Sequence, residues 1–379
     1  MNLYNYLQQL PVSGNGKGVI DLPPAEKQEA LNMVWEAFIA GEFHDRWELA
    51  KWLPKFGESA IAPLTELLED ETAHLDLRCE AAEILSKFQT PHAIFALTEV
   101  LQTEEESEVI TACAHALAKN GKVAIPTLTD ALANPETRLP AVQALAYLRK
   151  PETIAPLLSV VNDPQPEIRL SVIEALSTFR DSRIVEALME ALSDTNAQVR
   201  KEAVIGLGVR GNDNNPEPVV SALVPLLYDL NLEVCSHCAI ALGKLGNQSA
   251  IDALRDCLHS SATPSSLKQQ IVRGLSHTET SQTLSILASN LQDQPPSIIQ
   301  EIIAVFGRWK TSELHASVAD TLIAFFHHHA QLNDSIKQTL AVALGNLGIP
   351  SGKSVLSHLA QDETAMVQLH AQAALKKLP

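Results

Sequence analysis

The sequence predicts an all-α solenoid in which about eleven helical hairpins stack along residues 25–379. Three observations lead to this fold class. An apolar pattern of helical spacing recurs about every 32 residues, a second apolar-periodic segment precedes each recurrence, and turn residues separate the segments. A single hairpin cannot bury its apolar faces alone, so neighbouring hairpins must stack.

One residue marks the same place in every repeat, and we call it the anchor. The residues three and seven places after each anchor are apolar, as are most residues one place before it and ten places after it. These offsets lie on one face of an α-helix, which predicts that the anchor helix buries this stripe. The anchors are Arg46, Arg78, Ile110, Arg138, Arg169, Arg200, Cys235, Lys268, Ile299, Lys337 and Gln368.

The partner helix of each hairpin is predicted just before the anchor helix, as in residues 184–194 and 250–260. Prolines lie near the starts of several of these first helices, where a missing N–H is tolerated. Glycines follow several anchor helices, as helix C-caps do. They are Gly57, Gly121, Gly211, Gly246 and Gly348.

The repeats contain an Asp, then five residues and an Arg, then two residues and an Ala, with Leu-Gly-x-Leu-Gly further on. This pattern resembles the HEAT repeat. The resemblance covers about residues 25–379. It implies a right-handed α-solenoid of about eleven HEAT-like hairpins whose second helices line a concave groove. It also implies an Asp–Arg ladder between repeats, carried here by Asp163, Arg169, Asp194 and Arg200. We expect Arg200 to connect its repeat to the preceding one, which holds Arg169.

Two narrower resemblances suggest what the solenoid handles. The short repeat is similar to the HEAT-like repeats of the phycobilisome lyase group of cyanobacteria, which includes subunits of phycocyanobilin lyases and antenna-degradation proteins. It also resembles a HEAT protein that partners an A-type iron–sulfur scaffold.

Composition excludes several classes of protein. The formal net charge of −17 argues against a nucleic-acid partner, because phosphate binding draws on Lys and Arg. No apolar run approaches the roughly 18 residues of a membrane span. An odd count of five cysteines favours a reducing cytoplasm over a disulfide framework. Residues 1–24 are expected to form a separate segment with a short helix and a flexible Gly-rich joint at Gly14–Gly18.

The stretch VCSHCAIALGKLGN, residues 234–247, raises the question of a metal site, because Cys235 and Cys238 flank His237. The repeat register answers it. Cys238 lies three places after its anchor, a core position that Ala holds in several other repeats, and Cys behaves as a small apolar residue when buried. A zinc site would need two further ligands nearby. We therefore predict packing and no metal.

Other candidate motifs have equally plain explanations. The tract His327–His329 cannot direct three ligands one way, because neighbouring helical residues point ~100° apart. No nucleophile–base pair and no triad pattern is found in the sequence. We predict no catalytic residue and no resident cofactor.

Surface rows and end repeats carry the candidate partner-binding residues. Positions two, five and nine places after the anchor lie off the buried stripe, and there an apolar pair and several basic residues occur in an acidic chain. Aromatic residues gather in the first repeat, either to seal the array or to bind a partner. The candidates are Ile205, Ile240, Lys244, His237, Arg273 and Arg308 in the groove, and Trp35, Trp47 and Trp52 at the N-terminal end.

The sequence thus predicts a cytoplasmic, non-enzymatic protein-binding scaffold, adaptor or chaperone that acts in phycobilisome assembly or turnover. Two alternatives stay open. One is a bilin lyase or isomerase subunit that handles a linear tetrapyrrole, and the other is an accessory partner in iron–sulfur cluster assembly.

Overall fold

A computed structural model of the 379-residue chain describes residues 3–12, 18, 20–210, 215–292, 294–329 and 331–379. The chain divides into two compact units, Met1–Phe179 and Arg180–Pro379. Within the described residues all regular secondary structure is helical, apart from one isolated β-bridge between Val12 and Ile20. The predicted all-α solenoid is confirmed.

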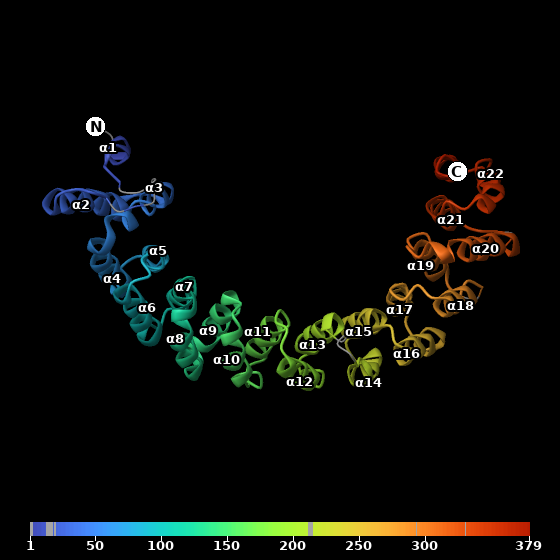
Figure 1. The fold of residues 1–379 in the computed structure, drawn as a ribbon, viewed down its shortest axis with the longest axis horizontal. Coiled ribbons are helices and arrows are strands. Elements are labelled where there is room, and N and C mark those ends of the chain that lie inside the picture. Colours follow the sequence, from blue (N-terminus) through green and yellow to red (C-terminus); the bar gives the residue numbers. More distant parts are fainter. Residues whose placement is uncertain (1–2, 13–17, 19, 211–214, 293, 330) are drawn as a thin grey trace. The chain divides into compact units, whose positions relative to one another are not determined.

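Unit 1 is a stack of hairpins (Figure 1). Its α-helices are α1 (Leu3–Gln9), α2 (Pro24–Ala40), α3 (Phe43–Leu49), α4 (Ile61–Glu69), α5 (Leu75–Leu85), α6 (Pro91–Thr103), α7 (Ser107–Lys119), α8 (Ile125–Asp130), α9 (Pro135–Leu148), α10 (Ile154–Ser159) and α11 (Pro166–Leu176). Short 3-10 helices join or extend them: η1 (Leu53–Ala60), η2 (Gly121–Ala124), η3 (Ala131–Ala133) and η4 (Pro151–Thr153).

Unit 2 repeats the same plan. Its α-helices are α12 (Ser182–Ala191), α13 (Ala197–Arg210), α14 (Glu217–Leu223), α15 (Leu232–Leu245), α16 (Gln248–His259), α17 (Ser265–Leu275), α18 (Ser281–Ser289), α19 (Pro296–Phe306), α20 (Ser312–His328), α21 (Asp334–Leu347), α22 (Lys353–Leu359) and α23 (Ala365–Leu375). The 3-10 helices are η5 (Val224–Tyr228) and η6 (Pro350–Gly352).

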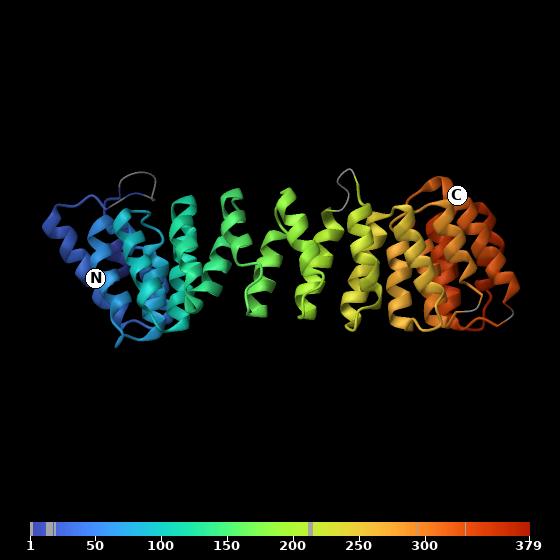
Figure 2. The ribbon, with the colours of Figure 1, turned by 90° about the horizontal axis from the view of Figure 1, so that it is seen from below.

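The predicted register is confirmed at every repeat. Each anchor is the fourth residue of an odd-numbered helix, from Arg46 in α3 to Gln368 in α23. Within each unit these odd-numbered helices form one layer, which we call the anchor layer, and the even-numbered helices form the other (Figure 1). Figure 2 shows the helices of each unit running side by side, across the direction in which its repeats follow one another.

The apolar stripe of each anchor helix forms the core. The residues three and seven places after the anchors are buried at every repeat except for Leu375, which belongs to the last helix, α23. Among the described residues α23 packs against α21 and α22, and no later helix covers Leu375.

Successive anchor helices of unit 2 approach closely at glycines. A Cβ atom built on Gly243 in α15 would lie 2.0 Å from the carbonyl oxygen of Gly274 in α17, and one built on Gly274 would lie 2.3 Å from the carbonyl oxygen of Ala239. Real Cβ atoms do not occupy such space, so these two helices pack backbone against backbone.

Glycine caps end the anchor helices as predicted at two places. Gly246 and Gly348 take left-handed C-cap conformations with φ of 63° and 67°. Two other sequence predictions, the Gly-rich joint and the cap at Gly211, fall wholly or mostly on residues 13–17, 19 and 211–214 and lie outside the described residues. The separate segment at residues 1–24 stays a prediction, although α1 is present and its Leu7 is fully buried.

Candidate functional site

Charged rungs connect neighbouring repeats within each unit. At several repeats a cationic anchor reaches the carboxylate that lies six residues before the next anchor along the chain, whereas Arg46 pairs with Glu80. Arg138 Nη1 lies 2.6 Å from Asp163 Oδ2, and Lys337 Nζ lies 2.7 Å from Asp362 Oδ2. Arg78 pairs with Glu104 in the same way. The same carboxylates accept hydrogen bonds from the backbone of their own turn, as Asp163 Oδ1 does from Gln165 N at 2.8 Å.

The rung made by Arg200 corrects one expectation. Its Nε lies 2.8 Å from Oδ2 of Asp229, and its Nη2 lies 2.8 Å from Oδ1 of the same residue. Asp229 belongs to the following repeat and not to the preceding one. Arg200 Nη1 instead donates to the backbone oxygen of Asp194 at 2.7 Å. Arg169 makes the equivalent bond to the backbone oxygen of Asp163, also at 2.7 Å. The sequence spacing within a repeat thus marks an Arg that caps its own turn and binds the next carboxylate.

The cysteine pair of α15 is buried. Cys238 has no exposed surface and its Sγ lies 3.0 Å from the backbone oxygen of Leu223, while Cys235 Sγ lies 3.1 Å from the backbone oxygen of Asp229. Burial raises the pKa of both thiols, which disfavours the thiolate that binds metals. Across the residues that the structure describes, no group of three or more His, Cys, Asp and Glu side chains is arranged to hold a metal ion.

The predicted apolar pair lies on neighbouring helices of the anchor layer. Ile205 in α13 and Ile240 in α15 are each partly exposed, in contrast to the fully buried residues of the core stripe. Val209, four residues after Ile205, is exposed. These side chains provide apolar surface that is open to solvent on the anchor layer of unit 2.

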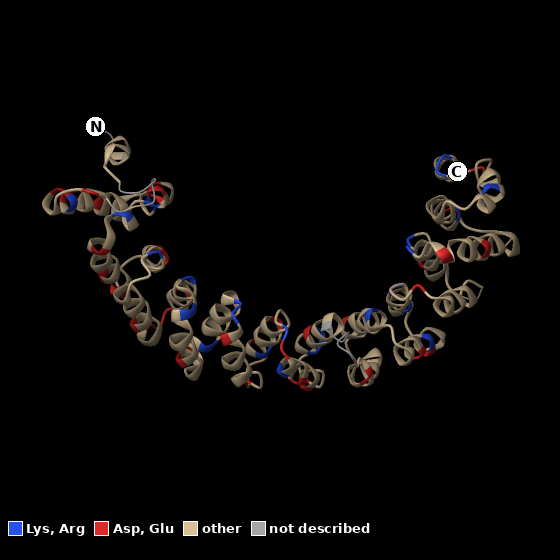
Figure 3. Cartoon of the chain, viewed as in Figure 1, with Lys and Arg blue, Asp and Glu red and all other residues tan. Residues whose placement is uncertain are grey.

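Basic side chains lie beside this apolar surface. Lys244, Arg273 and Arg308 are exposed on α15, α17 and just after α19. Figure 3 shows Lys and Arg residues at several points along the helices of the anchor layer in both units. We call Ile205, Ile240, Lys244, Arg273 and Arg308 the anchor-layer patch.

One carboxylate joins two of these cations. Arg273 donates to both oxygens of Glu301 at 2.9 Å, and Arg308 Nη2 lies 3.3 Å from Glu301 Oε1. The Arg273 hydrogen bonds lower the pKa of Glu301, which holds it ionised. Burial and then the charge of Lys244 lower the pKa of His277, so this neighbouring ring tends to be neutral. Together, Arg273, Arg308, Lys244 and Glu301 carry a net charge of two positive units.

His237, another predicted partner-binding residue, lies on α15. It is exposed, but its Nδ1 lies 2.8 Å from the backbone oxygen of Glu233 in the same helix. The imidazole is therefore held against its own helix backbone.

The three predicted tryptophans of the first repeat differ in environment. Trp47 is exposed, with Lys51 Nζ 3.1 Å from its ring centroid, and Trp52 is partly buried, with Lys55 Nζ at 3.8 Å. Trp35 is partly buried and stacks on Phe38, with ring centroids 5.9 Å apart. Only Trp47 among the three offers an open aromatic face, and Lys51 already covers part of it.

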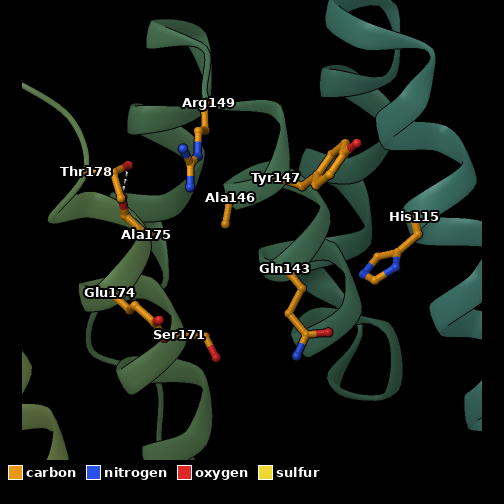
Figure 4. Close-up of a pocket in the computed structure, with 9 residues that line it drawn as sticks. All are labelled: His115, Gln143, Ala146, Tyr147, Arg149, Ser171, Glu174, Ala175 and Thr178. Atoms are coloured by element: carbon orange, nitrogen blue, oxygen red, sulfur yellow. Dashed lines mark hydrogen bonds between the residues drawn. The ribbon is translucent and has the colours of Figure 1, made fainter.

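A groove in unit 1 was missed at the sequence level. It has a volume of about 680 Å³ and lies over α7, α9 and α11 on the anchor layer (Figure 4). Its lining residues His115, Gln143 and Glu174 lie five places after their anchors, and the exposed Tyr147 lies nine places after its anchor. Extending the same offset rows to the first half of the chain would have found them.

The histidine tract ends α20 without converging. His328 and His329 each place Nδ1 near a backbone oxygen of their own helix, at 2.6 and 2.8 Å, and His327 contacts the ring of Phe326.

The described helices include none that combines the length and apolar character needed to cross a bilayer.

Comparison of the sequence with protein families gives matches to HEAT repeats. They cover residues 41–118, 125–208, 185–276 and 220–307, which together make up more than half of the chain. No curated protein sequence matches the chain.

Solved structures share the fold at low identity. The chain is similar to Kap95p in its complex with RanGDP, with a TM-score of 0.62 and 13% identity over 92% of this chain and 54% of that one. It is also similar to Kap121p, with a TM-score of 0.60 and 13% identity over 94% and 49%. A homology model of the full-length AP-3 complex is also similar, with a TM-score of 0.58 and 14% identity over 92% of this chain and 76% of that one. The chain spans about half the length of the two karyopherin chains, and at this identity the likeness concerns the fold alone.

Proposed function

We propose, from the premise that this chain belongs to the HEAT-repeat family, that it is a non-enzymatic scaffold that binds proteins through its anchor layer. The anchor-layer patch of unit 2 is the observation that carries the proposal. It combines partly exposed Ile205 and Ile240 with Lys244, Arg273 and Arg308 in a chain whose formal charge is −17. Apolar surface rimmed by charge is typical of protein-binding sites.

The chemistry of the patch indicates the kind of partner. Two isoleucines on adjacent helices offer an apolar contact, and two net positive charges beside them favour a partner with carboxylates next to apolar residues. Charge complementarity of this kind mainly raises the rate of association and selects against cationic partners. The groove over α7, α9 and α11 provides a second contact surface for such a partner within unit 1.

We propose further that the partner is a component of the phycobilisome, bound during assembly or turnover of the antenna in the cytoplasm. The support for this step is the resemblance of the repeat to the phycobilisome lyase group. All five cysteines are unpaired, which agrees with a reducing compartment.

Charge reversal tests the patch. Lys244→Glu should slow association with purified phycobilisome subunits and weaken its dependence on salt, without a change in melting temperature, because the side chain is exposed. Lys353→Glu, at an exposed position of α22 in the other layer, makes the same change in charge and serves as the control. Stopped-flow association rates at several salt concentrations give the comparison.

Two outcomes distinguish an error in the proposed binding surface from an error in the proposed partner. Equal rates for Lys244→Glu and Lys353→Glu would remove the patch from the interface. If phycobilisome subunits do not bind to the unmodified chain at all, the antenna role is wrong, and the patch is then tested with whichever identified protein the chain captures from its native cell.

A further inference from the structure

A pocket lies at the turns between two repeats of unit 2, away from the anchor-layer patch. Its volume is about 390 Å³, and we call it the rung pocket. The turn after η5 and the turn after α16 form its two sides. Its lining residues include Tyr228, Asp229, Leu230, Leu232, Cys235, Ala262, Pro264 and Leu267.

The ordinary rung shows what occupies this place elsewhere. Arg200 binds the carboxylate of Asp229 and also caps two carbonyl oxygens of its own turn, those of Asp194 at 2.7 Å and Thr195 at 3.2 Å. Arg138 likewise donates to two carbonyl oxygens of its own turn, at 2.7 and 3.1 Å. A guanidinium group therefore fills the gap between consecutive turns and hydrogen-bonds to both.

Both halves of this rung are missing at the rung pocket. The anchor is Cys235, and the residue six places before the next anchor is Ala262, where the charged rungs have a carboxylate. The thiol of Cys235 reaches the carbonyl oxygen of Asp229 at 3.1 Å, which corresponds to one of the two carbonyl bonds of Arg200. The short side chains of Cys235 and Ala262 leave the remaining space open.

A second uncharged rung shows that the open space is not a general result of losing the charges. Ile110 and Leu132 hold the two rung positions in unit 1, and their exposed fractions are only 2% and 5%. Large apolar side chains fill that rung from within the chain. The pair of small residues in unit 2 does not.

The walls of the rung pocket suit a cation on an apolar stem. The carbonyl groups of Asp229 and Leu230 occupy the sequence positions whose counterparts accept from Arg200, and both residues line the pocket. Tyr228 is 65% exposed and Leu230 is fully exposed, so the rim is apolar and aromatic. Guanidinium groups stack on such rings.

We propose that the rung pocket receives an arginine side chain from an extended segment of a partner protein, which completes the missing rung. Apolar residues on either side of that arginine cover Tyr228 and Leu230. The net negative charge of the chain favours a cationic segment over an acidic one. This site is separate from the anchor-layer patch and takes a partner segment of opposite charge.

A blocked tripeptide, acetyl-Leu-Arg-Leu-amide, tests the proposal against its neutral counterpart with citrulline in place of arginine. Saturation-transfer NMR on the full chain should show saturable binding of the arginine peptide and binding weaker by roughly tenfold or more for citrulline, because hydrogen bonds to charged groups are the stronger ones. The double variant Cys235→Arg/Ala262→Asp builds an internal rung without a change in net charge. It should abolish binding.

The single variant Ala262→Asp provides the opposite result from the same pocket. It keeps the space open and adds a carboxylate at an exposed position, so the arginine peptide should bind several-fold more tightly. Circular dichroism melts check that each variant is folded, and Ala262→Asp keeps the test decisive if the double variant is not. Three results would each overturn the proposal. They are equal binding of the arginine and citrulline peptides, unchanged binding of the arginine peptide to the double variant, and an affinity for a blocked single arginine that equals the affinity for the tripeptide.

Discussion

Cys238 illustrates how the repeat register assigns a role to a single residue. Its neighbourhood in the sequence, with Cys235 and His237, suggests a ligand cluster, yet its place three residues after the anchor puts it in the core. The structure agrees: Cys238 is fully buried, its Sγ lies 3.0 Å from the backbone oxygen of Leu223, and burial raises the pKa of the thiol.

Substitution of Cys238 should therefore follow the rules of core packing. Cys238→Ala should lower the free energy of unfolding by about 1 kcal/mol, through a small cavity and the lost bond to Leu223. Cys238→Arg should prevent folding of the surrounding repeats, because it overpacks the core and buries a charge. Urea denaturation followed by circular dichroism gives both values. Release of a bound metal by Cys238→Ala, detected by elemental analysis, would contradict the packing role.

Residue positions relative to the anchor were predictable, whereas pairing between repeats was not. Offsets along one helix decide whether a side chain faces the core, so the buried stripe follows from the sequence. The partner of Arg200 depends on where the next turn lies in space. Asp194, six residues before Arg200, and Asp229, 29 residues after it, are both compatible with the sequence, and only the structure selects Asp229 as the side-chain partner.

At the scale of helices, α15 and α17 pack more closely than side chains would allow. The contact depends on Gly243 and Gly274, each of which lies against backbone of the facing helix. The sequence contains a signal for this contact, because glycine inside a helix costs ~1 kcal/mol relative to alanine and needs a packing reason. Gly246 is predicted from the sequence as the C-cap at the end of this helix, but no prediction is made for Gly243 inside the helix.

Gly243→Ala tests the close approach. Alanine favours helix formation, so an open site would be stabilised, but here its Cβ would lie 2.0 Å from the Gly274 oxygen. We expect the free energy of unfolding to fall by roughly 1–3 kcal/mol because α15 and α17 must separate. Gly352→Ala is the control, since its Cβ would meet only the Leu344 side chain at 3.5 Å. A more stable Gly243→Ala variant in chemical denaturation would refute the tight contact.

At the scale of the whole chain, the period fixed by the anchors predicted the number and register of the hairpins. Each anchor lies at the fourth residue of its helix because the same turn chemistry and apolar spacing recur. The candidate sites were less predictable. The groove over α7, α9 and α11 and the rung pocket arise where side chains of neighbouring repeats leave space, and this depends on the sizes of residues about 30 positions apart and not on any local motif.

A chain of stacked repeats should also respond locally to the loss of one rung, because each repeat contacts mainly its neighbours. Arg200→Ala removes a bidentate pair with Asp229 in which both side chains are largely buried, and it leaves that carboxylate without its cation. A loss of roughly 1–3 kcal/mol is expected. Amide hydrogen exchange measured by mass spectrometry should rise in α13 and α15 and stay unchanged in α21 and α23.

Lys337→Ala provides the matched control in the same unit. It removes the rung to Asp362, so exchange should rise in α21 and α23 and stay unchanged in α13 and α15. The two variants together separate local coupling from a general loss of stability, because each serves as the unperturbed reference for the other. If both accelerate exchange equally throughout residues 180–379, then unit 2 unfolds as a single cooperative block, and the rungs stabilise that block as a whole instead of joining individual pairs of repeats.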